Sequence, residues 1–150
     1  MDAKDIKILA ESLKANYHTN DPFVLADIYG IRVVISDTLS RDRKAYTLKA
    51  ESYPTCIFIN GNYEKISQTV LCAHELGHAL LHHEGMNCFG VTKENAFTNI
   101  EYEANLFAVS LLFEESEFNT HTLSLNNYLL KTILDFNIRE HGKAENKQPV

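Results

Sequence analysis

The order of hydrophobic patterns along the chain predicts an α+β domain. Apolar residues recur at helical spacing near the start, cluster as in β-strands between residues 31 and 59, and return to helical spacing from about residue 64. A chain of 150 residues that is 45% hydrophobic can build one core but has little room for two. We therefore expect one domain over residues 1–140, with a short antiparallel or mixed sheet of about three strands between helices, and a polar, disordered tail over 141–150.

Two helices are predicted before the sheet. The first covers residues 3–16, where apolar side chains repeat every three or four positions. The second begins at Asp21-Pro22, because an aspartate caps a helix well and proline suits the first helical position. Gly30 is a suitable stop for this second helix.

Three apolar or β-branched segments predict the sheet, at residues 31–35, 45–49 and 55–59. Asn60-Gly61 is a turn signal after the third. We expect these strands to form an antiparallel meander. If residues 55–59 form an exposed edge, an extended substrate could pair with them, although an ordinary edge strand is an equal alternative.

A central helix is predicted from about residue 64, and Gly85 is its expected stop. It is apolar over much of its surface, which favours a buried position. Its main apolar stripe is formed by Ile66, Val70, Ala73, Gly77 and Leu80. A loop over 86–97 and helices over 100–113 and 123–138 complete the expected order.

Composition argues against several classes of partner. The net charge is −6, and a chain without a surplus of Lys and Arg is a poor binder of a phosphate backbone, so we expect no direct contact with nucleic acid. The sequence shows no apolar run long enough for a membrane span and no secretion-signal pattern. The three cysteines, Cys56, Cys72 and Cys88, are odd in number and lack a CxxC pair, which indicates a reducing compartment. We expect a cytoplasmic monomer.

The strongest chemical signal is the segment His74-Glu75-Leu76-Gly77-His78, which matches H-E-x-x-H. Residues four apart lie on one face of a helix, so the imidazoles of His74 and His78 can bind one metal ion from the same side. Zinc accepts such nitrogen ligands in a tetrahedral shell. Glu75 is offset by one residue and is therefore placed to act as general base on a water held by the zinc.

A third ligand is expected on the following helix. His82 lies eight residues after His74, about 12 Å along the axis, so one ion cannot bridge both. Glu101 shares a face with the small residues Ala104 and Ala108, which would let the two helices approach closely, and a carboxylate in such a contact is costly unless it is paired or bound to metal. We assign Glu101 as the third ligand, with Glu103 as the competing assignment.

Asn105, on the same face as Glu101, is expected to hydrogen-bond a ligand imidazole and fix its orientation. His82 and His83 are expected to be exposed or partly packed at the end of their helix, where an imidazolium complements the helix dipole. The residue that donates a hydrogen bond to the transition state is left unassigned, and the candidates are Tyr46, Tyr53, Tyr63, His82 and His83. Cys72 is interpreted as a small core residue.

The combination of His74-Glu75-Leu76-Gly77-His78 with Glu101-x-x-Ala104-Asn105-x-Phe107-Ala108 resembles the ImmA/IrrE family of metallo-endopeptidases. The upstream segment Tyr29-Gly30-Ile31-Arg32-Val33 is also similar. The resemblance implies a small zincin-like domain whose zinc is bound by two His and one Glu. It also implies cleavage of a helix-turn-helix repressor, which relieves repression in a phage or integrative element.

Two other functions stay open. The chain could bind a repressor without cutting it, with a retained zinc site, although such a site has no need of Glu75 and usually has a fourth protein ligand. It could also be a zinc hydrolase acting on something other than protein, because only the resemblance favours a protein substrate.

Overall fold

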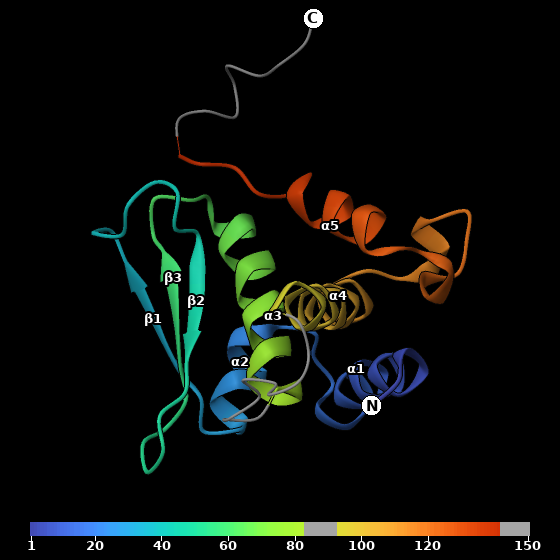
Figure 1. The fold of residues 1–150 in the computed structure, drawn as a ribbon, viewed down its shortest axis with the longest axis horizontal. Helices are drawn as coiled ribbons and strands as arrows, with labels where there is room; N and C mark the ends of the chain where they lie inside the picture. Colours follow the sequence, from blue (N-terminus) through green and yellow to red (C-terminus); the bar gives the residue numbers. More distant parts are fainter. Residues whose placement is uncertain (83–92, 142–150) are drawn as a thin grey trace, which may run out of the picture.

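The central helix of the fold separates a small sheet from the remaining long helices (Figure 1). These elements are seen in a computed structural model that describes residues 1–82 and 93–141. The α-helices are α1 (Ala3–Tyr17), α2 (Pro22–Ile28), α3 (Lys65–Leu81), α4 (Lys93–Leu112) and α5 (Asn127–Asp135), and the short 3-10 helices are η1 (Glu115–Glu117) and η2 (Thr122–Ser124). The strands are β1 (Arg32–Ser36), β2 (Ala45–Leu48) and β3 (Cys56–Asn60). The predicted α+β class is confirmed.

The sheet has the order β1-β3-β2, so the predicted antiparallel meander is wrong. β1 runs parallel to β3, and β2 runs antiparallel to β3. The chain crosses from one edge to the other through residues 37–44, and the side chain of Asn60 stabilises this crossing by donating to the backbone carbonyls of Ser40 and Arg43, both at 3.1 Å. β3 is therefore the central strand, and the expectation that residues 55–59 form an exposed edge is also wrong.

The central position of β3 in the sheet agrees with the burial of its apolar side chains. Ile57 and Ile59 alternate onto one face, where both are fully buried in the core. Both α3 and α2 contact the elements of this layer, with α3 lying against β2 and β3. Because the strand order places β2 at one edge of the sheet, β2 is the edge strand that lies beside the central helix.

The helix start and stop signals before the sheet are confirmed. Asp21 accepts a hydrogen bond from the backbone N–H of Phe23 at 2.9 Å, and Pro22 occupies the first helical position of α2. Gly30 follows the helix with φ of +71°, a left-handed conformation that glycine adopts without strain. α1 begins at a capping box formed by Asp2 and Asp5.

α3 and α4 approach each other closely, as the small residues of α4 predict. A Cβ atom at Gly77 would lie 3.2 Å from the Cα atom of Ala104 and 3.2 Å from Cδ1 of Phe107. Ala104 and Ala108 are fully buried. The absence of a side chain at Gly77 therefore brings the backbones of the two helices together next to His78.

Several helix boundaries and one apolar position differ from the prediction. α4 begins at Lys93, inside the expected loop, and the expected last helix is split into η2 and the shorter α5. Ile66 is 70% exposed, because it lies in the first turn of α3 before that helix enters the core. α3 ends at Leu81, and the expected stop at Gly85 lies outside the described residues.

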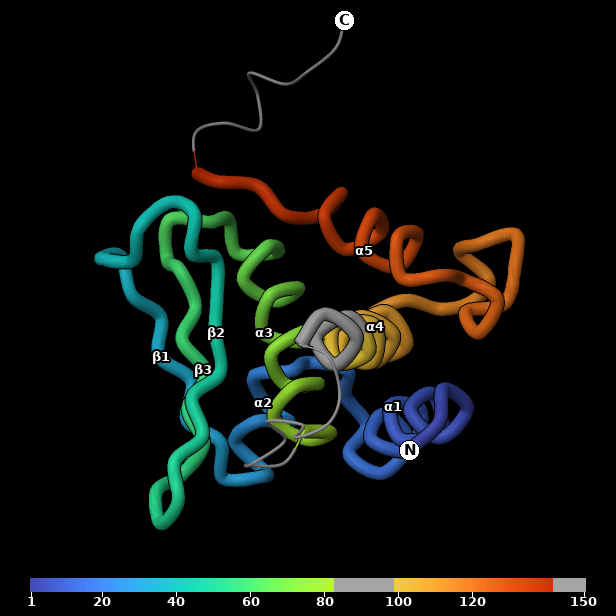
Figure 2. The backbone as a smooth tube through the Cα atoms, in the orientation of Figure 1, coloured from blue at the N-terminus to red at the C-terminus, as the bar shows by residue number. Residues whose placement is uncertain are grey.

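The chain after α5 returns to the start of α3 (Figure 2). The backbone N–H of Glu64 donates to the carbonyl of Arg139 at 2.8 Å. The Ser67 hydroxyl donates to the carbonyl of Asn137 at 2.9 Å. This attachment holds α5 across α4, with which it also packs. His141 donates its backbone N–H to Asn62, and the rest of the expected tail, residues 142–150, lies outside the described part.

The interpretation of Cys72 as a core residue is confirmed, since it is fully buried and burial raises the pKa of its thiol. Cys56 and Cys72 are free thiols, and Cys88 lies outside the described residues. Across residues 1–82 and 93–141, no helix combines the length and apolar character that a membrane crossing requires.

Candidate metal centre

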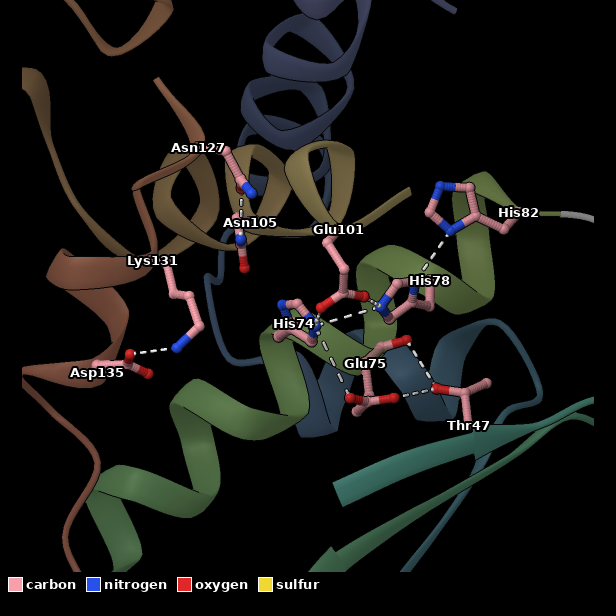
Figure 3. Close-up of polar contacts among 10 residues, drawn as sticks. All are labelled: Thr47, His74, Glu75, His78, His82, Glu101, Asn105, Asn127, Lys131 and Asp135. Carbon is pink, nitrogen blue, oxygen red and sulfur yellow. Dashed lines mark hydrogen bonds and ion pairs between the residues drawn. The ribbon is translucent and has the colours of Figure 1, made fainter. Parts of the chain in front are cut away.

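Three side chains from two helices converge on one point (Figure 3). His74 and His78 come from successive turns of α3, and Glu101 comes from α4. The Glu101 carboxylate lies 2.7 Å from Nε2 of His78 and 3.4 Å from Nε2 of His74. The two Nε2 atoms are 3.2 Å apart. Among the described residues, these three form the group whose ligand atoms all lie within 4.8 Å of one another.

The chemistry of this group fits a zinc ion. Two imidazole nitrogens and one carboxylate are the ligand set of many catalytic zinc sites, which keep a further position open. The three side chains are only partly buried, so the group is accessible from solvent. His74, His78 and Glu101 could therefore hold a metal ion without rearrangement of the two helices.

Contacts within this group lower the pKa of Glu101 and raise the pKa of His74. Burial alone would raise the pKa of Glu101, but hydrogen bonds from His74 and His78 hold it well below its usual range. Burial alone would lower the pKa of His74, but the hydrogen bond to Glu101 and the nearby charge of Glu75 raise it above its usual value. The carboxylate is therefore ionised, which is the form that binds a cation.

Glu75 is buried beside this group rather than within it. Its side chain is 9% exposed, and its carboxylate lies 4.0 Å from Nε2 of His74. The Thr47 hydroxyl, from β2, donates to Oε1 of Glu75 at 2.7 Å (Figure 3). The sequence analysis missed Thr47, because nothing near this residue indicates which helix its strand lies against.

Asn105 lies on the other side of His74. It hydrogen-bonds the His74 side chain, a contact that contributes to the raised pKa of this histidine. Its amide Nδ2 donates to Oδ1 of Asn127 at 2.8 Å. Because the amide nitrogen is used by Asn127, the amide oxygen is left to accept from the imidazole.

His82 is more buried than the sequence analysis expected, and Glu103, the competing assignment for the third ligand, contacts it. His82 is only 7% exposed, and burial lowers its pKa, so the expectation of an exposed or partly packed imidazolium at the helix end is wrong. Glu103 accepts a hydrogen bond at 2.8 Å from Nε2 of His82 rather than facing His74. The structure thus brings Glu101, and not Glu103, to the two histidines of the motif.

The tyrosines considered as transition-state donors have other contacts. Tyr46 stacks on Phe58 with ring centroids 4.8 Å apart, on the face of the sheet opposite to Thr47. Tyr53 is 75% exposed, and the Tyr63 hydroxyl donates to the carbonyl of Arg41. In the described part of the chain, none of these three tyrosine hydroxyls hydrogen-bonds to His74 or His78, and His83 lies outside the described ranges.

A cavity of about 290 Å³ adjoins the group of ligands. β2 contributes Ala45, and α3 contributes His74 and Glu75. α5 contributes Lys131 and Asp135, which form an ion pair at 2.5 Å. The space in front of Glu75 is therefore bounded by the edge strand on one side and by α5 on the other.

This combination of an α+β fold with a helix bearing two histidines and a glutamate, facing a carboxylate on a second helix, is that of a metallopeptidase. Residues 26–141 match the family model described as Peptidase M78, the IrrE N-terminal-like domain, so the chain belongs to the ImmA/IrrE family. A similar curated protein is the "uncharacterized immunity region protein 2" of Bacillus phage phi105. It is 34% identical over 113 residues, which cover 73% of this chain and 69% of the phage protein. No solved structure matches the chain.

Proposed function

We propose that this protein is a zinc-dependent endopeptidase that cleaves a helix-turn-helix transcriptional repressor. The observation that carries the proposal is the convergence of His74, His78 and Glu101 beside the buried carboxylate of Glu75. Membership of a metallopeptidase family supports the same reaction.

In the proposed mechanism, His74, His78 and Glu101 would hold the zinc, which when bound would supply polarisation of the scissile carbonyl and a pKa of about 7 for water. Glu75 accepts the proton of the attacking water and returns it to the leaving amine. The hydrogen bond from Thr47 restrains one oxygen of Glu75, so that the other oxygen, on the side of His74, handles the proton.

The substrate is proposed from the family and from the relative. The ImmA/IrrE resemblance implies a repressor, and the phage relative is named as an immunity region protein. An extended segment of such a substrate could pair with β2, the edge strand beside α3, rather than with β3, the strand that the sequence analysis considered for this role. Ala45 of this strand lines the cavity that adjoins Glu75, so a peptide paired with β2 would pass the proposed metal centre.

The test is an incubation of the purified full chain and zinc with each helix-turn-helix protein that the genes neighbouring its own are found to encode. Mass spectrometry should detect repressor fragments, and both a chelator and Glu75→Gln should abolish them. A Glu75→Gln variant that cleaves as fast as the wild type contradicts the mechanism. Intact repressor released from its operator would instead identify a regulator that binds without cutting.

A further inference from the structure

The buried His82 and the partly exposed Glu103 form a pair directly behind one of the two motif histidines. Nε2 of His82 lies 2.8 Å from Oε1 of Glu103. Nδ1 of His82 lies 3.0 Å from Nδ1 of His78 (Figure 3). The His82 side chain is 9% exposed and that of Glu103 is 28% exposed, so the ring of His82 is shielded from water while the carboxylate is partly accessible. A continuous row of hydrogen bonds therefore runs from Glu103 on α4 through His82 to His78.

The positions of the protons in this row follow from the atoms involved. A carboxylate only accepts hydrogen bonds, so Nε2 of His82 must carry the proton that points to Glu103. In a neutral imidazole, Nδ1 of His82 then has a free lone pair and must accept the proton of His78 Nδ1. Once a metal ion takes the place of the hydrogen bond from Nε2 of His78 to Glu101, Nε2 is the unprotonated nitrogen of His78 and the remaining proton is on Nδ1.

We propose that Glu103 and His82 are positioning residues that hold His78 in the one tautomer able to bind a metal ion through Nε2. This inference rests on the proposed function, because it assigns a role toward the same metal centre. The opposite tautomer of His82 would place a lone pair against the Glu103 carboxylate and would leave a proton on Nε2 of His78, where the metal must bind.

The two motif histidines are thus oriented by separate networks. His74 is held from one side by Asn105, whose amide is held by Asn127. His78 is held from the other side by His82, whose backbone carbonyl accepts from the Lys49 side chain. Partners outside a metal's own ligands commonly fix the tautomer and the ring orientation of a ligand histidine.

Zinc affinity of the full chain, measured by competition with a chromogenic chelator, tests the pair. Glu103→Ala and His82→Phe should weaken zinc binding by about 10- to 100-fold. Glu103→Gln, whose amide oxygen can still accept from His82, should restore affinity close to that of the wild type. Glu51→Ala is the matched control, because it removes the same charge at an exposed turn and should leave the affinity unchanged.

The tautomers can be observed directly by long-range ¹H–¹⁵N spectra of the zinc-loaded wild type, even if a variant does not fold. His82 should carry its proton on Nε2 and have an unprotonated Nδ1. A proton on Nδ1 of His82, or an unchanged zinc affinity in Glu103→Ala, would overturn this inference while leaving the proposed function intact. A wild-type protein that binds no zinc would overturn both.

Discussion

The Thr47 hydroxyl lies 2.7 Å from Oε1 of Glu75 and 3.2 Å from the backbone carbonyl of the same residue. Thr47 belongs to the edge strand β2, whereas Glu75 belongs to the central helix α3. A single side chain therefore connects the sheet to the proposed general base. The orientation of Glu75 depends on the position of β2 as well as on its own helix.

Replacement of this hydroxyl should impair catalysis without removing the metal. In Thr47→Val the Glu75 carboxylate loses a hydrogen-bond donor, and we expect kcat/KM for repressor cleavage to fall about tenfold, or about 1.4 kcal/mol. Thr47→Ser keeps the hydroxyl and should retain most activity. Full activity in Thr47→Val, at unchanged zinc content, would show that Glu75 needs no such support.

The amide contact behind His74 should contribute to metal affinity. Asn105→Ala removes the acceptor for the imidazole, and we expect zinc affinity to fall by about 10-fold in a chelator competition. Asn127→Ala should have a smaller effect in the same direction, because it frees Asn105 to rotate. Asn16→Ala, at an exposed position of α1, is the control. Equal affinities for all three variants would contradict this role.

The sequence predicted the elements of this site better than their surroundings. The spacing of His74 and His78 fixes their relation within one helix, and the small residues Ala104 and Ala108 correctly predicted a close contact with the next helix. The α+β class followed in the same way from local periodicity.

Contacts between distant elements were not predictable. The β1-β3-β2 order depends on a crossing stabilised by Asn60, and local patterns carry no information about it. The contact of Thr47 with Glu75 depends on that order. His82 was expected to be exposed or partly packed because it ends a helix, but it is buried and its ring donates a hydrogen bond to Glu103. All three failures concern tertiary partners rather than secondary structure.

A methyl group at Gly77 should destabilise the fold. Alanine normally favours a helix over glycine by about 1 kcal/mol, but here its Cβ would lie 3.2 Å from the Cα atom of Ala104. We expect Gly77→Ala to lower the free energy of unfolding by about 1–3 kcal/mol in urea. The exposed Ala15→Gly in α1 calibrates helix propensity alone. A stabilised Gly77→Ala would mean that α3 and α4 can separate without cost.

Glu115 should make stability depend on pH in the acidic range. A backbone hydrogen bond from Thr122 and a hydrogen bond from Lys7 lower the pKa of Glu115 to about 2. The unfolded chain has an ordinary carboxyl pKa of about 4.3, so in this window the unfolded state binds more protons. The stabilisation is therefore present above about pH 4.3 and is lost as the pH falls toward the folded pKa.

The comparison uses metal-free wild type and Glu115→Gln, unfolded by denaturant at about pH 6 and about pH 3. The variant should be less stable than the wild type at the higher pH, and the difference should shrink at the lower pH. Glu51→Gln, in an exposed turn, should show no such trend. A difference that is constant or grows as the pH falls would contradict the assigned contacts.

The most direct test of the account is metal analysis of the purified full chain. We predict one zinc ion per chain in the wild type and in Glu75→Gln, and loss of that ion in His78→Ala and in Glu101→Ala. Glu11→Ala, at an exposed position of α1, should retain the zinc. A wild-type protein without zinc, or a Glu101→Ala variant that binds zinc as tightly as the wild type, would contradict a metal centre built from His74, His78 and Glu101.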